Sequence, residues 1–173
     1  MKNIKDIVYS LNSLARTGWM LSGVCPACSE TVSMHSFASS LIALELSLKF
    51  DDVNPYEAAS IALIHDIGEA TIGDITKGID LDKKEVENEA INNLNISNLI
   101  KELYFRYSER KTKEAIIAKI SDLIATYLVA LKYEKEGFNI DQIKDSTYNE
   151  IINISRQNNI EVKVKNFLSD LLK

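Results

Sequence analysis

The densest group of chemically active side chains lies between residues 61 and 74. An apolar run at 61–64 predicts a buried helix, and the next ten residues hold one histidine, three acids and two glycines. The ionisable residues are His65, Asp66, Glu69 and Asp74. On a helix, Glu69 would lie one turn beyond His65 and Asp66. The glycine before Asp74 would let the chain turn back toward the same pocket. Because burying unpaired charge is costly, a bound metal would explain the cluster, with one imidazole and one carboxylate as ligands and another carboxylate left for chemistry.

The histidine count sharpens this hypothesis. The chain has only two histidines, and His35 lies at the head of a second expected apolar helix. The alternative is that both are structural histidines of the hydrophobic core. The pattern of His65-Asp66, with Glu69 three residues on and a Gly-Asp pair beyond, favours a metal site.

Asp122 stands in the apolar face of a long expected helix. Aspartate is a poor helix former in mid-helix and is expensive to bury alone. Two interpretations are open: an ion pair with Lys119, one turn earlier, or a carboxylate that points into the metal site. The second is favoured, because the site lacks a fourth ligand and buried acids need cations.

The remaining pattern predicts an all-α fold. Asn54 followed by Pro55 predicts a helix start, as does Thr112, and residues 80–82 are expected to cap a charged helix. Gly18 is placed like a helix stop, residues 20–32 are expected to form a loop, and the helix at 33–50, apolar nearly all round, should be central. The expected helices cover about 4–15, 33–50, 55–64, 83–94, 99–107, 113–136, 141–155 and 161–172. We find no alternating runs typical of strands, no internal repeat and no low-complexity tract.

Length and composition set further bounds. A chain of 173 residues that is 46% hydrophobic predicts a single domain, residues 1–173, with a core at about 7–131 and peripheral helices at about 141–172. A net charge of -5 is unsuited to gripping polymeric nucleic acid, but a metal and one arginine could still attract a small anion. No segment approaches the roughly 20 apolar residues of a membrane span, and the charged start is unlike a signal peptide, so a cytoplasmic location is expected with no membrane partner.

Two cysteines, Cys25 and Cys28, form a Cys-Pro-Ala-Cys segment. This spacing suits a redox pair, half of a zinc site or a local disulfide. A complete zinc site would need two more soft ligands, which only a dimer could supply. A structural or incidental turn is the favoured interpretation.

Three stretches together resemble a known family. They are Arg16-Thr17-Gly18-Trp19, the segment from Glu30 to Ser36 that contains His35, and the segment from His65 to Ile75. The pattern H…HD…D resembles the HD-domain metal-dependent phosphohydrolases, in particular the YfbR-like branch of 5'-deoxynucleotidases, which includes the HD domain-containing protein 2 group. The resemblance covers roughly residues 7–131 and implies a helical bundle with the metal between its central helices.

The resemblance also implies roles for individual residues. It implies that one divalent ion is held by His35, His65, Asp66 and Asp122. It implies that Glu69 positions or deprotonates the attacking water. Glu69 and Asp74 are the two acids predicted to be catalytic. Arg16 would hold the phosphate, while Trp19 and Asp74 would contact the sugar. The chain departs from the family at Met34, where members usually have an acid, and in the cysteine-bearing loop before His35.

These observations predict a cytoplasmic, dimeric, mononuclear 5'-deoxynucleotidase. HD proteins with two or three metals need additional histidine ligands, which this chain lacks. Two nitrogen and two oxygen ligands suit Co, Mn, Fe, Ni or Zn. The alternatives are another small-nucleotide phosphohydrolase, for example one acting on nucleoside triphosphates, or a non-catalytic HD module that binds nucleotide as a regulator.

Overall fold

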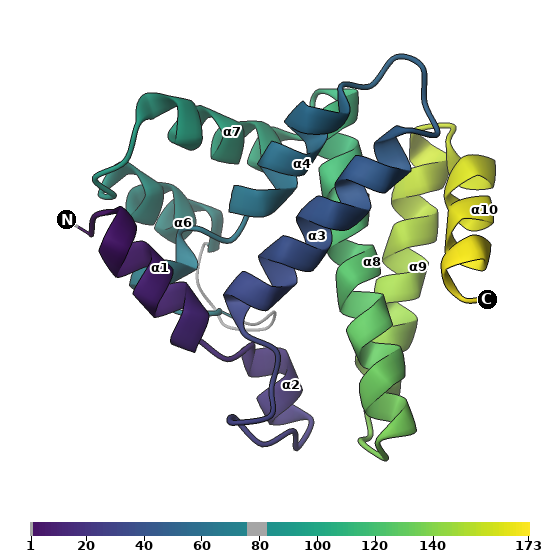
Figure 1. Ribbon diagram of the computed structural model, residues 1–173, viewed down its shortest axis with the longest axis horizontal. Helices are drawn as coiled ribbons and strands as arrows, with labels where there is room; N and C mark the ends of the chain where they lie inside the picture. The colour runs from purple at the N-terminus through teal and green to yellow at the C-terminus, as the bar shows by residue number, and fades with distance from the viewer. Residues whose placement is uncertain (1, 76–82) are drawn as a thin grey trace.

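The computed structural model describes residues 2–75 and 83–173, and these residues form a bundle of helices that contains no β-strand (Figure 1). The prediction of an all-α fold is confirmed. The helices are α1 (Ile4–Ser13), α2 (Thr17–Leu21), α3 (Val32–Ser47), α4 (Pro55–Ile64), α5 (Glu69–Ile72), α6 (Lys83–Asn92), α7 (Asn98–Glu109), α8 (Lys113–Lys135), α9 (Asp141–Gln157) and α10 (Glu161–Leu171). Within the described residues, no helix combines the length and the apolar character that crossing a membrane requires.

Helices α3, α4 and α8 pack together at the centre of the molecule (Figure 1). Their contact surfaces carry fully buried alanines, which let helix backbones approach closely. These alanines are Ala43, Ala58, Ala62 and Ala118. Isoleucines of α8, such as Ile120 and Ile124, fill the space between them. The main hydrophobic core is therefore built by the three helices that also carry the histidines and Asp122.

The predicted helix starts at residues 54 and 112 are confirmed. The side chain of Asn54 accepts hydrogen bonds from the N–H groups of residues 56 and 57, and Pro55 is the first residue of α4. Thr112 accepts from the N–H of Ala115 at the start of α8. Helix α8 ends as expected before Gly137, whose φ of 93° a side chain would disfavour. The predicted cap at 80–82 lies outside the described residues.

Gly18 is not a helix stop, and the prediction is wrong at this point. Helix α1 ends at Ser13, and Gly18 lies inside the short helix α2, which extends into the predicted loop. The reason is a tertiary contact: the N–H of Arg16 donates to the carbonyl of Glu30, and the N–H of Val32 donates to that of Leu14, both at 2.9 Å. This antiparallel bridge holds the backbone extended between α1 and α2.

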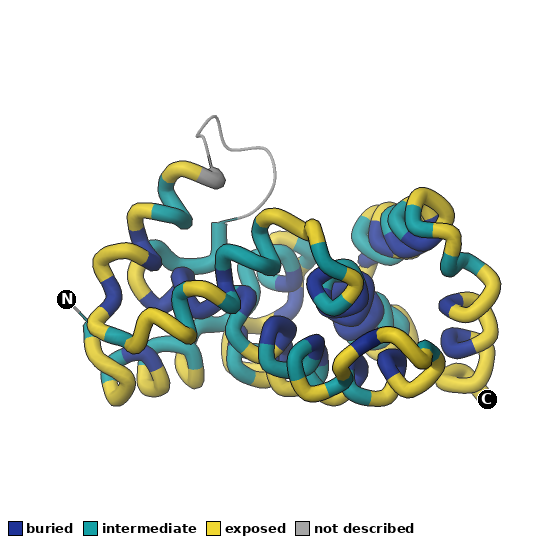
Figure 2. Tube along the Cα trace, turned by 90° about the horizontal axis from the view of Figure 1, so that it is seen from above, coloured by how far each residue is buried: buried dark blue, intermediate teal, exposed yellow. Residues whose placement is uncertain are grey.

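Helix α3 is central, as predicted, but one of its faces is exposed. The large apolar residues on that face are Met34, Phe37 and Leu41, continued by Leu48 at the C-cap, and the exposed Glu45 lies between the last two. The tube in Figure 2 alternates between buried and exposed stretches along the helices, because each helix covers the core with one side only.

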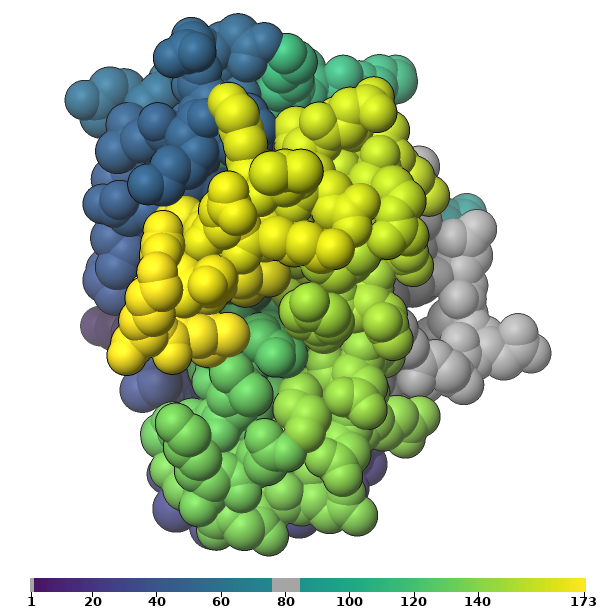
Figure 3. Space-filling view, turned by 90° about the vertical axis from the view of Figure 1, so that its right-hand side faces the viewer, coloured from purple at the N-terminus to yellow at the C-terminus, as the bar shows by residue number. Residues whose placement is uncertain are grey.

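The two closing helices lie at the edge of the molecule and also contribute to the core. Figure 3 shows α9 and α10 covering one end of the bundle beside α8. Their buried residues include Ile151 of α9 and Val164, Phe167 and Leu168 of α10, all within the main hydrophobic cluster.

Candidate metal centre

The HD segment is a turn between two helices. Helix α4 ends at Ile64, and His65 is the C-cap residue that follows it. The N–H of Glu69 donates to the carbonyl of Asp66 at 3.0 Å, and α5 begins at Glu69. The residue at 68 is a glycine that packs against α6: a Cβ there would lie 3.4 Å from the side chain of Ile91, in van der Waals contact. The predicted helical spacing is replaced by tight turns, yet His65, Asp66 and Glu69 all line one cavity.

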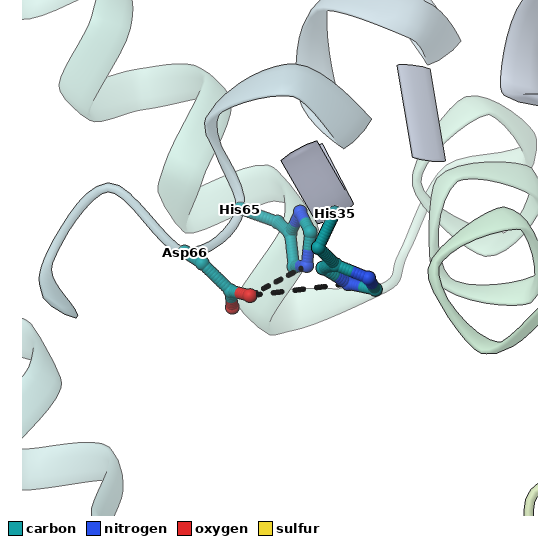
Figure 4. A group of neighbouring side chains, drawn as sticks. All are labelled: His35, His65 and Asp66. Carbon is teal, nitrogen blue, oxygen red and sulfur yellow. Dashed lines mark ion pairs between the residues drawn. The ribbon is translucent and has the colours of Figure 1, made fainter. Parts of the chain in front are cut away.

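His35, His65 and Asp66 converge on one point (Figure 4). One ligand atom from each lies within 4.8 Å of the others. The Nε2 of His65 is 3.0 Å from Asp66 Oδ2, and the Nε2 of His35 is 4.0 Å from the same oxygen. The Nδ1–H of His65 donates to the carbonyl of Ala62 at 2.7 Å, which turns its Nε2 toward the cluster.

Asp122 satisfies both interpretations drawn from the sequence. Its Oδ1 lies 2.9 Å from His35 Nε2 and 3.6 Å from His65 Nε2. Its Oδ2 accepts from Lys119 Nζ at 2.8 Å and from the hydroxyl of Tyr107 at 2.5 Å. The carboxylate therefore pairs with Lys119 on one side and faces the two histidines on the other.

The donor set fits a divalent ion. Neighbouring ligands at about 2.1 Å from one metal lie about 3 Å apart, and the contacts among these four residues run from 2.9 to 4.0 Å. The buried Oε2 of Glu69 has no hydrogen-bond partner, and the buried Nε2 of His65 faces carboxylate oxygens without a well-aligned hydrogen bond to them. Buried polar atoms are normally paired, so these two atoms favour a site that binds a cation.

The two histidines are perturbed in opposite directions. Burial lowers the pKa of His65, but the carboxylates of Asp66 and Asp122 outweigh it and raise that pKa to about 10. Burial and the guanidinium of Arg16 hold the pKa of His35 below its ordinary value. The carboxylates of Asp66 and Asp122 therefore favour a positive charge beside His65.

The acids show the same excess of negative charge. Burial, followed by the carboxylates of Asp66 and Asp74, raises the pKa of Glu69 to about 9. Burial also works against ionisation of Asp66, but His65 and Arg16 hold its pKa below the ordinary range. The protein's own cations leave part of the carboxylate charge uncompensated. A cation bound at this place would neutralise it.

The remaining predicted residues lie around a cavity of about 810 Å³ beside the cluster. Arg16 donates from Nη1 to Asp66 Oδ2 at 3.0 Å. Asp74 accepts from the backbone N–H of Thr17 at 2.5 Å, which ties the chain after α5 to the start of α2. Arg16, Trp19, Glu69 and Asp74 all line this cavity, as the sequence predicted for a shared pocket.

Trp19 is mainly a core residue. Only 2% of it is exposed, and it packs with Val24, Ala130, Tyr133 and Ile140. Its indole N–H donates to Glu30 Oε2 at 3.0 Å. Trp19 therefore fills the core and also borders the cavity.

Sequence reasoning assigned no role to several cavity residues. Tyr107 lies on α7 and Arg110 directly after it, while Gln142 and Ser146 belong to α9, and all four line the cavity. Helix spacing places Gln142 and Ser146 on one face, but nothing in the sequence indicates that this face meets the cavity.

Nothing in the sequence indicated a role for Glu30 either. Met34 is 60% exposed, and the carboxylate near His35 Nδ1 comes from Glu30 instead, with Oε1 3.8 Å away.

Cys25 and Cys28 are free and exposed. The N–H of Cys28 donates to the carbonyl of Cys25 at 2.9 Å, which is the turn that the sequence favoured. Among the described residues, the only His, Cys, Asp and Glu group that could hold a metal is that of His35, His65 and Asp66.

The fold and the histidine–aspartate cluster define a class of protein. The model of the HD domain family matches residues 8–162, and the chain belongs to that family. The resemblance drawn from the sequence motifs is thereby confirmed.

Curated relatives narrow the comparison. The chain is 30% identical to 5'-deoxynucleotidase HDDC2 of Dictyostelium discoideum over 148 residues, which cover 76% of each protein. It is 33% identical to human 5'-deoxynucleotidase HDDC2 over 137 residues, which cover 74% of this chain and 65% of the human protein. Among solved structures, the PH0347 protein from Pyrococcus horikoshii OT3 is similar with a TM-score of 0.82 and 27% identity, over 96% of both chains.

Proposed function

We propose that this protein is a metal-dependent 5'-deoxynucleotidase that hydrolyses deoxynucleoside 5'-monophosphates to a deoxynucleoside and phosphate. One observation carries the proposal: two imidazoles and two carboxylates converge at the edge of a cavity that is also lined by a buried acid and an arginine. The naming of curated relatives as 5'-deoxynucleotidases supports the same activity.

Four residues would hold one divalent ion: His35, His65, Asp66 and Asp122. Such an ion polarises water and a phosphate oxygen and favours the ionised form of Glu69. The N and O donor set suits Co, Mn, Fe, Ni or Zn.

The protein's own groups then divide the remaining work. Glu69 accepts the proton of the attacking water, since its Oε2 is buried, unpaired and beside the cluster. Arg16 binds phosphate oxygens, because a guanidinium can grip two of them at once. Trp19 and Asp74 form the wall against which the sugar lies.

The cavity also favours one alternative activity. Arg110 and Lys119 line it together with Arg16, so a longer phosphate chain could find cations there. A nucleoside triphosphate phosphohydrolase is therefore the second candidate, while Glu69 and Asp74 argue against a regulator that only binds nucleotide.

A phosphate-release screen tests these proposals. The protein is stripped of metal with a chelator, and each divalent ion is added back to a panel of deoxy and ribo mono- and triphosphates. We expect the highest turnover with deoxynucleoside monophosphates. Faster hydrolysis of triphosphates would favour the second candidate, and no release with any ion would favour the regulator.

We also propose that the protein is a homodimer. The exposed apolar face of α3, formed by Met34, Phe37, Leu41 and Leu48, would be covered by a second copy. Light scattering of the wild type and of Phe37→Lys tests this, with a dimer expected only for the wild type. The cytoplasmic location is a prediction from sequence.

A further inference from the structure

Glu30 lies between the metal cluster and the short helix α2, and it contacts both. Its side chain is buried, and its Oε2 accepts the indole N–H of Trp19 at 3.0 Å. Its Oε1 lies 3.8 Å from the Nδ1 of His35. The two oxygens of one carboxylate thus face a predicted metal ligand and a predicted wall of the sugar site.

The backbone of Glu30 is fixed as firmly as its side chain. Its N–H donates to the hydroxyl of Tyr133 at 2.9 Å, and its carbonyl accepts from the N–H of Arg16 at 2.9 Å. Residue 31 beside it forms the bridge with Ala15 and caps α3. A carboxylate held in this way has little freedom to move independently of α2 or α3.

His35 has an unmet requirement on the side that faces Glu30. Its Nδ1 is buried and has no hydrogen-bond partner, while its Nε2 faces Asp122 and Asp66. A neutral imidazole that offers the Nε2 lone pair to an ion carries its hydrogen on Nδ1 and needs an acceptor there. A relative movement of about 1 Å between the two side chains would bring Glu30 Oε1 to hydrogen-bond distance of that nitrogen, since a hydrogen bond of this kind is about 2.8 Å long.

We propose that Glu30 is a positioning residue that couples the metal site to Trp19. By accepting from His35 Nδ1, it fixes the tautomer that presents Nε2 to the ion. By accepting from Trp19 Nε1, it holds the indole at the cavity wall. The link to sugar discrimination rests on the proposed deoxynucleotidase function, whereas the link to metal binding does not.

The variant Glu30→Gln separates these two tasks. Its amide oxygen can still accept from Trp19, but its NH₂ group then faces His35 Nδ1. A donor at that position favours the tautomer with hydrogen on Nε2, which removes the lone pair that would bind the ion. Loss of such a supporting contact typically weakens metal affinity about 10- to 100-fold.

Metal affinity is the first measurement. Zinc binding to the metal-free protein is measured by competition with a chromophoric chelator for the wild type, Glu30→Gln and Glu45→Gln. Glu45 is an exposed glutamate on α3, the helix that carries His35, so its variant controls for loss of one charge. We expect zinc affinity to fall about 10- to 100-fold in Glu30→Gln alone. Affinity equal to that of Glu45→Gln would overturn the proposal.

The fluorescence of Trp19 is the second measurement, because Trp19 is the sole tryptophan. Zinc does not quench tryptophan through unpaired electrons, so a change in emission on zinc binding reports a change around the indole. We expect such a change at one zinc per wild-type chain. Emission that stays constant while zinc binds would overturn the coupling, and this wild-type titration stands even where the glutamine variant does not fold.

Glu30→Ala removes the contacts with both His35 and Trp19, and its activity on nucleotides is the third measurement. It should weaken zinc binding, shift Trp19 emission to longer wavelength and lower the deoxy-to-ribo ratio of kcat/KM. A variant with weak zinc binding but unchanged emission and ratio would show that Glu30 supports His35 only. If no nucleotide is hydrolysed by the wild type, the proposed function fails, while the zinc and fluorescence results still decide the role of Glu30.

Discussion

The two sides of the site are built from different kinds of structure. The metal side stands on long helices: His35 in α3, His65 at the end of α4 and Asp122 in α8, which together form the main core. The recognition side, formed by Arg16, Trp19 and Asp74, is built on two short helices. Trp19 belongs to the five-residue α2, Arg16 directly precedes that helix, and Asp74 follows the four-residue α5.

Helices of one turn are not stable by their own hydrogen bonds. Their positions depend on contacts such as the one between Thr17 N–H and Asp74, and on the bridge between Ala15 and Thr31. We therefore expect substitutions to act in an all-or-none manner on the metal side and in a graded manner on the recognition side.

The largest effect is expected from loss of a ligand. Alanine at position 35, 65, 66 or 122 should abolish bound metal and reduce activity to background, because each residue contributes one of the four donors that face the cluster. Metal analysis of the purified variants checks this, with the exposed Asp145→Ala as control. Stoichiometric metal in Asp122→Ala would remove Asp122 from the ligand set and weaken the contrast between the two sides.

Replacing Glu69 should cost less and leave the metal in place. We expect turnover of Glu69→Gln to fall about a hundredfold or more, which is typical for loss of a general base. Steady-state kinetics at saturating metal, combined with metal analysis, measures the effect. Near-normal turnover with full metal content would exclude Glu69 as the base.

The recognition side should respond in smaller steps that depend on the substrate. Arg16→Ala should lower kcat/KM about 10- to 100-fold for deoxy and ribo monophosphates alike, because both carry the same phosphate. Trp19→Phe should instead narrow the preference for the deoxy sugar, since a smaller ring leaves room for a 2'-hydroxyl.

Phenylalanine is the better substitution because truncating a buried tryptophan to alanine costs about 3–5 kcal/mol of stability. The measurement is the deoxy-to-ribo ratio of kcat/KM for one matched base. An unchanged ratio in Trp19→Phe would mean that the sugar is read elsewhere, with Asp74 as the next candidate.

The smallest effect concerns stability without metal. The pKa of Glu69 is raised to about 9 in the fold, above its unfolded value of 4.5, so the fold favours the protonated form. The stability that this proton contributes is present below pH 4.5 and is lost as the pH rises through 9. Glu69→Gln imitates the protonated acid at every pH, and should raise the melting temperature of the metal-free protein by a few degrees at pH 8 and hardly at pH 5. Equal melting temperatures of the wild type and Glu69→Gln at pH 8 would show that ionised Glu69 does not destabilise the metal-free fold.

The metal side was largely predictable from sequence. Ionisable residues at the end of an apolar run are costly unless a ligand needs them, so the spacing of His65, Asp66 and Glu69 pointed to a shared site. Caps such as Asn54 and Thr112 were readable because each acts on the residues directly after it.

The recognition side was less predictable because its geometry depends on contacts between distant segments. The bridge that ends α1 pairs residue 15 with residue 31, and Gly18 cannot be distinguished from a stop without it. Glu30 looks like an ordinary acid in the sequence, and only the fold brings its oxygens to Trp19 and His35. The part that α9 takes in the cavity likewise depends on how it packs against α8.

His35 and Asp122 meet at 2.9 Å although 87 positions separate them along the chain. An ion gripped by both can bind only after α3 and α8 have docked, so it binds the folded chain and not the unfolded one. Mass action then adds free energy of unfolding in proportion to the logarithm of the free ion concentration, about 2.7 kcal/mol at one hundred times the dissociation constant. The supply of metal would thereby set how long each molecule persists as well as how fast it works.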